Sequence, residues 1–135
     1  MASTFPSPEW VQEFGQKLNS DPHYAQIAKN WEGDLSFTIE PSGPVKETIY
    51  YYFDLWHGTC RKAEVLKDLN IKPAFVLTAP YENFARVLKG DLDPMTAMLT
   101  RKLAVQGNMA VMMRSIPIVL DFVRCAREIT TEILT

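Results

Sequence analysis

One run of residues, 45–57, constrains the fold more than any other, because it is apolar on both sides of an extended chain. Every second position from Ile49 to Leu55 is bulky and apolar, and the alternate positions include Tyr50, Tyr52 and, just beyond, Trp56. Successive side chains of a strand point to opposite faces of a sheet. The run therefore predicts a strand within a sheet, with other elements covering part of each face.

Further strands are expected on both sides of this run. Leu35, Phe37 and Ile39 alternate with polar residues, which predicts a half-buried strand. Gly58 allows a hairpin turn into the strand that follows. The expected strands cover residues 35–40, 45–57, 59–67, 74–78 and 101–106.

Several helices are expected to begin at a capping residue followed by proline. The pairs Ser7-Pro8, Asp21-Pro22 and Asp93-Pro94 all have this form. Two short helices should open the chain, the second ended by Gly33, and a helix from Pro80 should end at Gly90. Because helices precede and follow the strands, the sequence predicts an α+β fold with helices over a largely antiparallel sheet.

The last helix is expected to run from Ile118 to the end of the chain. Val119 and Phe122 belong to an apolar stripe that ends at Ile133, whereas Asp121 is expected to face water. This stripe has no partner in the sequence except the sheet face that the other helices also cover. The helix is therefore expected to close the apolar interior.

Composition and charge narrow the possible functions. The 135 residues suit one domain, 1–135, with one core, and the net charge of −2 gives no reason to expect a nucleic-acid partner. No apolar run approaches the roughly 20 residues that span a bilayer, and no signal peptide or peroxisomal address is evident. With only two cysteines, Cys60 and Cys125, the expectation is a cytoplasmic protein with reduced thiols.

The stretch 88–113 contains five of the six methionines. Met95 and Met98 follow the Asp93-Pro94 pair, and the other three methionines come at helical spacing after Gly107. Methionine is flexible and polarizable, so it suits a surface that moulds itself to variable apolar shapes, although it also fills gaps in ordinary cores. The sequence leaves both interpretations open.

This stretch resembles the sterol carrier protein type 2 domain family, and the resemblance extends back through residues 72–88. Two positions depart from the family pattern. Arg101 stands where the family usually has glycine before Lys-Leu, and Ala74 or Phe75 stands where an aspartate usually opens a strand. The matching residues in 88–113 are Gly90, Asp93, Pro94, Lys102, Leu103, Gly107, Asn108 and Met109.

The resemblance implies a five-stranded sheet with an apolar tunnel between sheet and helices. It also implies a lipid ligand: a fatty acid, acyl-coenzyme A, phospholipid or sterol, with transient membrane contact, no cofactor, no metal and no catalytic residues. Together with the apolar faces described above, it predicts that the lipid contacts Phe84, Leu88, Met95, Met98, Leu99, Val105, Met109, Met112, Met113, Val119 and Phe122.

Three other functions are compatible with part of the sequence pattern. An accessory or protein-interaction domain with a vestigial cavity would share the same apolar pattern. A small enzyme could use Asp54, His57 and Cys60 near one hairpin, but strand alternation puts Asp54 and His57 on opposite faces. The aromatic strand could stack nucleic-acid bases, but it lacks the basic groove that normally accompanies such stacking. The leading hypothesis is a non-catalytic lipid carrier.

Overall fold

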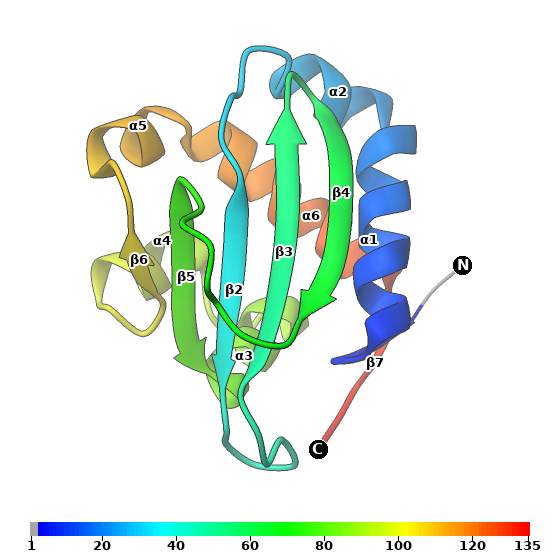
Figure 1. The fold of residues 1–135 in the computed structure, drawn as a ribbon, viewed down its shortest axis with the longest axis vertical. Coiled ribbons are helices and arrows are strands. Elements are labelled where there is room, and N and C mark those ends of the chain that lie inside the picture. Colours follow the sequence, from blue (N-terminus) through cyan, green and yellow to red (C-terminus); the bar gives the residue numbers. More distant parts are fainter. Residues whose placement is uncertain (1–2) are drawn as a thin grey trace.

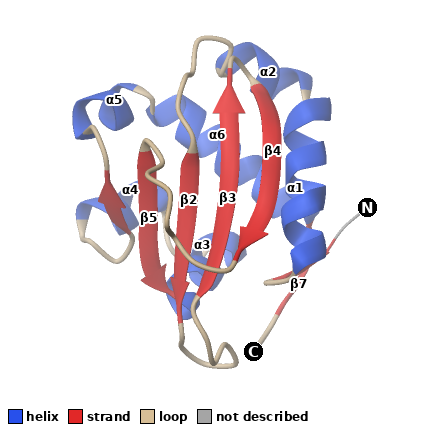
Figure 2. Ribbon diagram, viewed as in Figure 1, coloured by secondary structure: helices blue, strands red, loops and turns tan. Residues whose placement is uncertain are grey.

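The computed structural model describes residues 3–135 and contains a five-stranded sheet with helices on one face, as Figures 1 and 2 show. The strand order is β4-β3-β2-β5-β6, and only β2 and β5 pair in parallel. The predicted five-stranded, largely antiparallel sheet is therefore confirmed. The strands are β2 (Leu35–Glu40), β3 (Ile49–Trp56), β4 (Thr59–Leu66), β5 (Phe75–Pro80) and β6 (Ala104–Gln106).

Three helices begin where their caps predict, whereas the last helix begins at Ile116, two residues before the expected start. Ser7 Oγ accepts a hydrogen bond from the backbone N–H of Trp10, and Asp21 and Asp93 cap the next helices in the same way. The second helix ends at Ile27, well before the expected stop at Gly33. The helices are α1 (Pro8–Ser20), α2 (Pro22–Ile27), α3 (Tyr81–Lys89), α4 (Pro94–Leu99), α5 (Met109–Arg114) and α6 (Ile116–Ile129).

Strand β3, second in the sheet order, buries one face under the helices and has partial cover on the other. Tyr51, Phe53 and Leu55 are buried on the helix side. On the opposite face, the segment 67–74 crosses in front of the sheet on its way from β4 to β5 (Figure 1). Asp34 ties this segment to the sheet, because its carboxylate accepts bonds from the Tyr52 hydroxyl at 2.8 Å and from the Ala74 N–H at 2.7 Å.

The hairpin between β3 and β4 contains a bulge that matters for packing. Leu55 lies opposite Cys60, but Asp54 lies opposite Lys62, so Arg61 is the extra residue. Cys60 and Ala63 therefore both lie beneath α1. Gly15 of α1 faces them so closely that an added Cβ would lie 2.9 Å from the Ala63 Cβ atom. Glycine at this position lets α1 approach the edge of the sheet.

A second, two-stranded sheet joins the two ends of the described chain and was not expected from the sequence. Strand β1 (Ser3–Phe5) pairs in parallel with β7 (Thr130–Ile133). The expectation that the apolar stripe of the last helix continues to Ile133 is therefore wrong, since α6 ends at Ile129 and the chain continues as a strand. In the part of the chain that the structure describes, no helix has the length and apolar character needed to cross a bilayer.

Candidate functional site

An apolar cavity of about 90 Å³ lies between the sheet and the helices. Its floor is formed by side chains of the three inner strands, among them Leu35, Phe37, Leu55 and Leu77. Almost no polar atom reaches its wall. A cavity of this kind excludes charged ligands and favours hydrocarbon.

The roof of the cavity comes mainly from α3 and α6, because both helices turn an apolar stripe toward the sheet. Phe84, Val87 and Leu88 contribute from α3. Five residues contribute from α6, spaced so that they share one face of the helix. These residues are Ile118, Val119, Phe122, Val123 and Ala126. The prediction that the last helix faces the apolar interior is therefore confirmed for the part that is helical.

Phe122 is the central ring of the aromatic packing beside the cavity. Its centroid lies 4.6 Å from that of Phe14 on α1 and 5.9 Å from that of Phe53 on β3, where the rings meet edge to face. Phe37 lies 6.3 Å away and contacts Phe84 on its other side. Because such pairs add to the stabilisation from burial, this cluster fixes one end of the cavity.

The structure divides the predicted lipid-contacting residues into two groups. Phe84, Leu88, Met98, Met112, Val119 and Phe122 line the cavity. Met95, Leu99, Val105, Met109 and Met113 do not line it. The three methionines of α5 come at helical spacing, but only Met112 is buried, whereas Met109 and Met113 are each 41% exposed.

Several cavity residues were missed by the sequence interpretation. Tyr24 and Trp31 come from α2 and the segment after it, and Phe5 and Trp10 come from β1 and α1. Periodicity shows that a side chain faces inward, and it cannot show whether that side chain meets another residue or an empty space.

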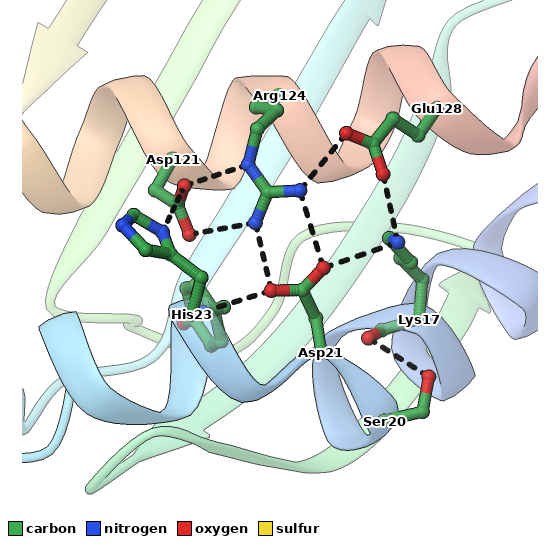
Figure 3. Close-up of polar contacts among 8 residues, drawn as sticks. Lys17, Ser20, Asp21, His23, Asp121, Arg124 and Glu128 are labelled. Carbon is green, nitrogen blue, oxygen red and sulfur yellow. Dashed lines mark hydrogen bonds and ion pairs between the residues drawn. The ribbon is translucent and has the colours of Figure 1, made fainter.

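A cluster of ion pairs fastens α6 to the junction of α1 and α2, next to the cavity (Figure 3). Arg124 lies between two carboxylates: its Nη2 is 2.7 Å from Asp21 Oδ1 and its Nε is 2.7 Å from Asp121 Oδ1. Lys17 and Glu128 extend the cluster, with 2.8 Å between Lys17 Nζ and Glu128 Oε1. Asp121 was expected to face water, and this expectation is wrong, since the residue is only 6% exposed.

The cluster has electrostatic consequences for its acids. Hydrogen bonding from Arg124, helped by the Tyr24 N–H, holds the pKa of Asp21 far below its usual range. Hydrogen bonds from Lys17 and Arg124 likewise lower the pKa of Glu128. Asp21, Asp121 and Cys125 have ligand atoms within 4.8 Å of one another, which would suit a metal ion. The Arg124 guanidinium already supplies the positive charge there, and burial raises the pKa of the Cys125 thiol to about 12.

The candidate catalytic residues have separate partners. Asp54 is paired with Arg61 at 3.0 Å, and His57 Nε2 lies 2.6 Å from Glu32 Oε2. The Cys60 thiol is buried and donates to the Lys62 carbonyl, and burial raises its pKa to about 11. A nucleophilic cysteine needs a lowered pKa and a base in contact. The hairpin therefore does not assemble the constellation that nucleophilic catalysis requires.

The two departures from the family pattern have local explanations. Arg101 adopts a left-handed backbone conformation with φ of 62°, which glycine adopts at no steric cost. The usual glycine therefore suits this turn, and arginine is strained there. At the other departure, the Ala74 N–H donates a hydrogen bond to the Asp34 carboxylate over 2.7 Å. Gly107 packs against the same strand, since an added Cβ would lie 2.5 Å from the Ala74 carbonyl oxygen.

Comparison with known proteins identifies a family and close structural neighbours. The model of the SCP-2 sterol transfer family matches residues 11–119. A crystal structure of sterol carrier protein 2 is 30% identical, with a TM-score of 0.83, and the match covers 92% of this chain and 98% of that one. A solution structure of a Thermus thermophilus protein is 28% identical, also with a TM-score of 0.83, and the match covers 92% and 88%.

A more distant neighbour shares the fold and contains a ligand. The solution structure of sterol carrier protein 2 from Aedes aegypti, in complex with palmitate, is 19% identical with a TM-score of 0.54, and the match covers 87% of this chain and 93% of that one. At this identity the likeness shows the fold alone. No curated protein matches the chain in sequence.

Proposed function

This chain belongs to the SCP-2 sterol transfer family, and on that premise we propose that it binds one apolar lipid in the cavity between its sheet and helices. The observation that carries the proposal is the apolar wall that α3 and α6 place opposite the sheet. Ligand sites with walls of this kind gain affinity from removing hydrocarbon from water.

The chemistry of the wall selects the kind of lipid. With almost no polar atom in the wall, a headgroup has no partner inside, so only the hydrocarbon part of the lipid enters. A fatty acid, acyl-coenzyme A, phospholipid or sterol fits this requirement. Each buried methylene contributes about 0.8 kcal/mol, so a dozen give on the order of 10 kcal/mol before the costs of association.

The cavity must enlarge to hold such a ligand. Its volume of about 90 Å³ is well below the roughly 300–1,000 Å³ that is usual for ligand pockets. We propose that it widens into a tunnel where Met98 of α4 and Met112 of α5 form its wall. These helices are only six residues long, and methionine side chains change shape easily. That a protein of this fold has been solved with palmitate supports the proposal.

We propose that the protein carries lipid and does not catalyse a reaction. Residues 1–135 act as one domain in this role. The separate partners of Asp54, His57 and Cys60 support this view. A variant with His57→Ala and Cys60→Ser should bind lipid as the unchanged protein does. We also propose a cytoplasmic location, because Cys60 and Cys125 are both free thiols.

The test is direct identification and titration of the ligand. Organic extraction of the purified protein, followed by mass spectrometry, should release one class of lipid. The stripped protein should then bind acyl chains of graded length with affinity that rises with length. If nothing is extracted and no chain length binds, the proposal is wrong, and an accessory domain with a vestigial cavity is the remaining interpretation.

A pair of variants locates the binding to the cavity. Val119→Phe places a ring in the void and should weaken binding of long chains more than of short ones. Val111→Phe is the matched control, because Val111 is also a half-buried helical valine but does not line the cavity. Equal binding by both variants at every chain length would place the ligand elsewhere.

A further inference from the structure

Among the described residues, the cavity wall contains one polar side chain that has no partner. The wall is hydrocarbon and methionine except at Trp10, Tyr24 and Trp31. The Trp10 indole N–H donates to Thr130 Oγ1 over 2.7 Å, and the Trp31 indole N–H donates to the Gly33 carbonyl over 2.9 Å. Within residues 3–135, the Tyr24 hydroxyl makes no hydrogen bond. It is therefore the group of the wall that is free to bind a ligand.

The Tyr24 hydroxyl is costly to leave unpaired, because the residue is only 1% exposed. A buried polar group without a hydrogen bond loses its hydration for nothing in return, so such groups are rare and each calls for an explanation. Burial raises the pKa of the hydroxyl, and the nearby Cys60, Cys125 and Asp121 raise it further. The group therefore keeps its proton at neutral pH and is available as a donor.

The surroundings of Tyr24 favour a neutral acceptor over an anion. The cavity wall contains no lysine, arginine or histidine. Arg124, the cation of the neighbouring ion-pair cluster, is already bound by Asp21 and Asp121. A carboxylate placed beside Tyr24 would therefore find one hydroxyl and no counter-charge, which does not offset the loss of its hydration. A hydroxyl or ketone oxygen loses much less hydration and gains the same hydrogen bond.

Tyr24 lies at one side of the cavity, away from the proposed widening. Its ring packs beside Phe122, with 6.5 Å between the two centroids. Figure 1 shows α2, which carries Tyr24, next to the β3–β4 hairpin, whereas α4 and α5 lie beyond β5. A chain that enters past Met98 and Met112 would therefore reach Tyr24 with its far end.

From these observations we propose that Tyr24 determines specificity: its hydroxyl donates a hydrogen bond to a single neutral oxygen on the hydrocarbon part of the lipid. That oxygen belongs to a hydroxyl or a ketone, as in a hydroxylated acyl chain or a sterol, and a charged headgroup stays outside the cavity. The inference deepens the proposed function and rests on it, because Tyr24 can select among lipids only if the cavity binds them.

Pairs of ligands that differ by one oxygen test the preference. Fatty acids of graded length are paired with their ω-hydroxy forms, and cholestane is paired with cholestanol; each ligand displaces a fluorescent fatty acid from the delipidated full chain. Burying a hydroxyl without a partner would weaken binding about ten-fold or more, whereas a hydrogen bond from Tyr24 offsets that cost. In at least one kind of pair the hydroxylated ligand should therefore bind as tightly as the plain one or more tightly, and that pair identifies the source of the oxygen.

Two tyrosine variants assign the preference to one hydroxyl. Tyr24→Phe removes the donor, so the ratio of the affinities for hydroxylated and plain ligands should fall about ten-fold. Tyr51→Phe is the matched control and should leave this ratio as it is. Tyr51 is also 1% exposed, but it does not line the cavity and its hydroxyl donates to the Ser7 carbonyl over 3.1 Å.

The same variants differ in a second measurement, chemical denaturation without ligand. Tyr24→Phe removes a hydroxyl that has no partner in the described chain, so it should unfold at the same denaturant concentration as the unchanged protein or at a higher one. Tyr51→Phe breaks a hydrogen bond and should unfold at a lower concentration. A Tyr24→Phe protein that unfolds as early as Tyr51→Phe would mean that the hydroxyl serves the fold, and would overturn the inference.

A charged ligand and the plain fatty acids separate the possible failures. The α,ω-dicarboxylic acid places a carboxylate where the ω-hydroxy acid places a hydroxyl, and it should bind at least ten-fold more weakly at neutral pH; equal binding would overturn the neutral acceptor. If plain fatty acids bind but Tyr24→Phe and the unchanged protein show the same affinity ratios, the inference fails and the proposed function stands. If no lipid of any kind binds, the proposed function fails and the inference falls with it.

Discussion

Arg124 and Asp21 are 103 residues apart in the sequence, yet Arg124 Nη2 donates a hydrogen bond to Asp21 Oδ1 over 2.7 Å. A second bond joins Arg124 Nη1 to Asp21 Oδ2 at 3.2 Å, so the guanidinium binds both carboxylate oxygens. This contact holds α6, which carries one wall of the cavity, against the start of α2.

Replacing Arg124 should therefore cost stability. Arg124→Gln would leave the buried carboxylates of Asp21 and Asp121 without their main partner, and the free energy of unfolding should fall by about 2–4 kcal/mol. The loss should be in the lower part of this range, because the Arg124 side chain is 35% exposed. Chemical denaturation measures it. Arg61→Gln, which breaks the exposed pair with Asp54, is the control and should cost less than about 1 kcal/mol.

Acid should loosen the same cluster. The pKa values of Asp21 and Glu128 are lowered in the folded protein, so their ionised forms stabilise the fold above the pKa of the unfolded chain. That contribution is lost as pH falls, beginning near the unfolded value of about 4. Denaturation at several pH values should show a shallower acid dependence for Asp21→Asn. An Asp21→Asn variant with the same acid dependence as the unchanged protein would contradict this prediction.

Met112 should behave as a wall residue when it is shortened. Leu18→Ala, in the filled core, should cost about 2–5 kcal/mol, because the deletion opens a new cavity. Met112→Ala should cost less in the delipidated protein, since the side chain already borders a void, and it should change the preference for acyl-chain length. Equal stability losses with unchanged chain-length preference would make Met112 an ordinary core residue.

Arg101→Gly should stabilise the protein. Arginine at φ of 62° is strained, and glycine would relieve the strain while adding some entropy to the unfolded chain, for a net gain of about 0.5–1 kcal/mol. Thermal unfolding measures the change. Lys102 does not adopt a left-handed conformation, so Lys102→Gly relieves no strain and should be neutral or destabilising. If the two variants lose stability alike, the strain argument is wrong.

The sequence predicted most where the controlling interaction is local. The caps at Ser7, Asp21 and Asp93 act over three residues, so the pattern contains both partners. The alternation likewise put Tyr51 and Phe53 on one face of β3, and the structure shows that this face is buried. These local patterns placed α1, α3, α4 and the five strands of the main sheet.

What the sequence did not predict depends on distant partners. Asp121 was expected to face water because its burial and its contact with His23 arise only when α2 packs against α6. Strands β1 and β7 were missed because each is very short and finds its partner at the opposite end of the described chain. In the candidate site, Met109 and Met112 are both methionines of α5, yet Met112 is buried and Met109 is exposed. Only the way α5 packs against the cavity decides which of them is buried.

The parallel pairing of β1 with β7 has a mechanical consequence. Ser3 lies opposite Thr130 and Phe5 lies opposite Ile133, so the chain enters the pair at one end and leaves it at the other. A pulling force applied between Ser3 and Thr135 would therefore load the hydrogen bonds of this pair in shear, all at once. Antiparallel ends would instead unzip one bond at a time, which takes less force. Under such a force, the β1–β7 pair must rupture before the load reaches the helices around the cavity.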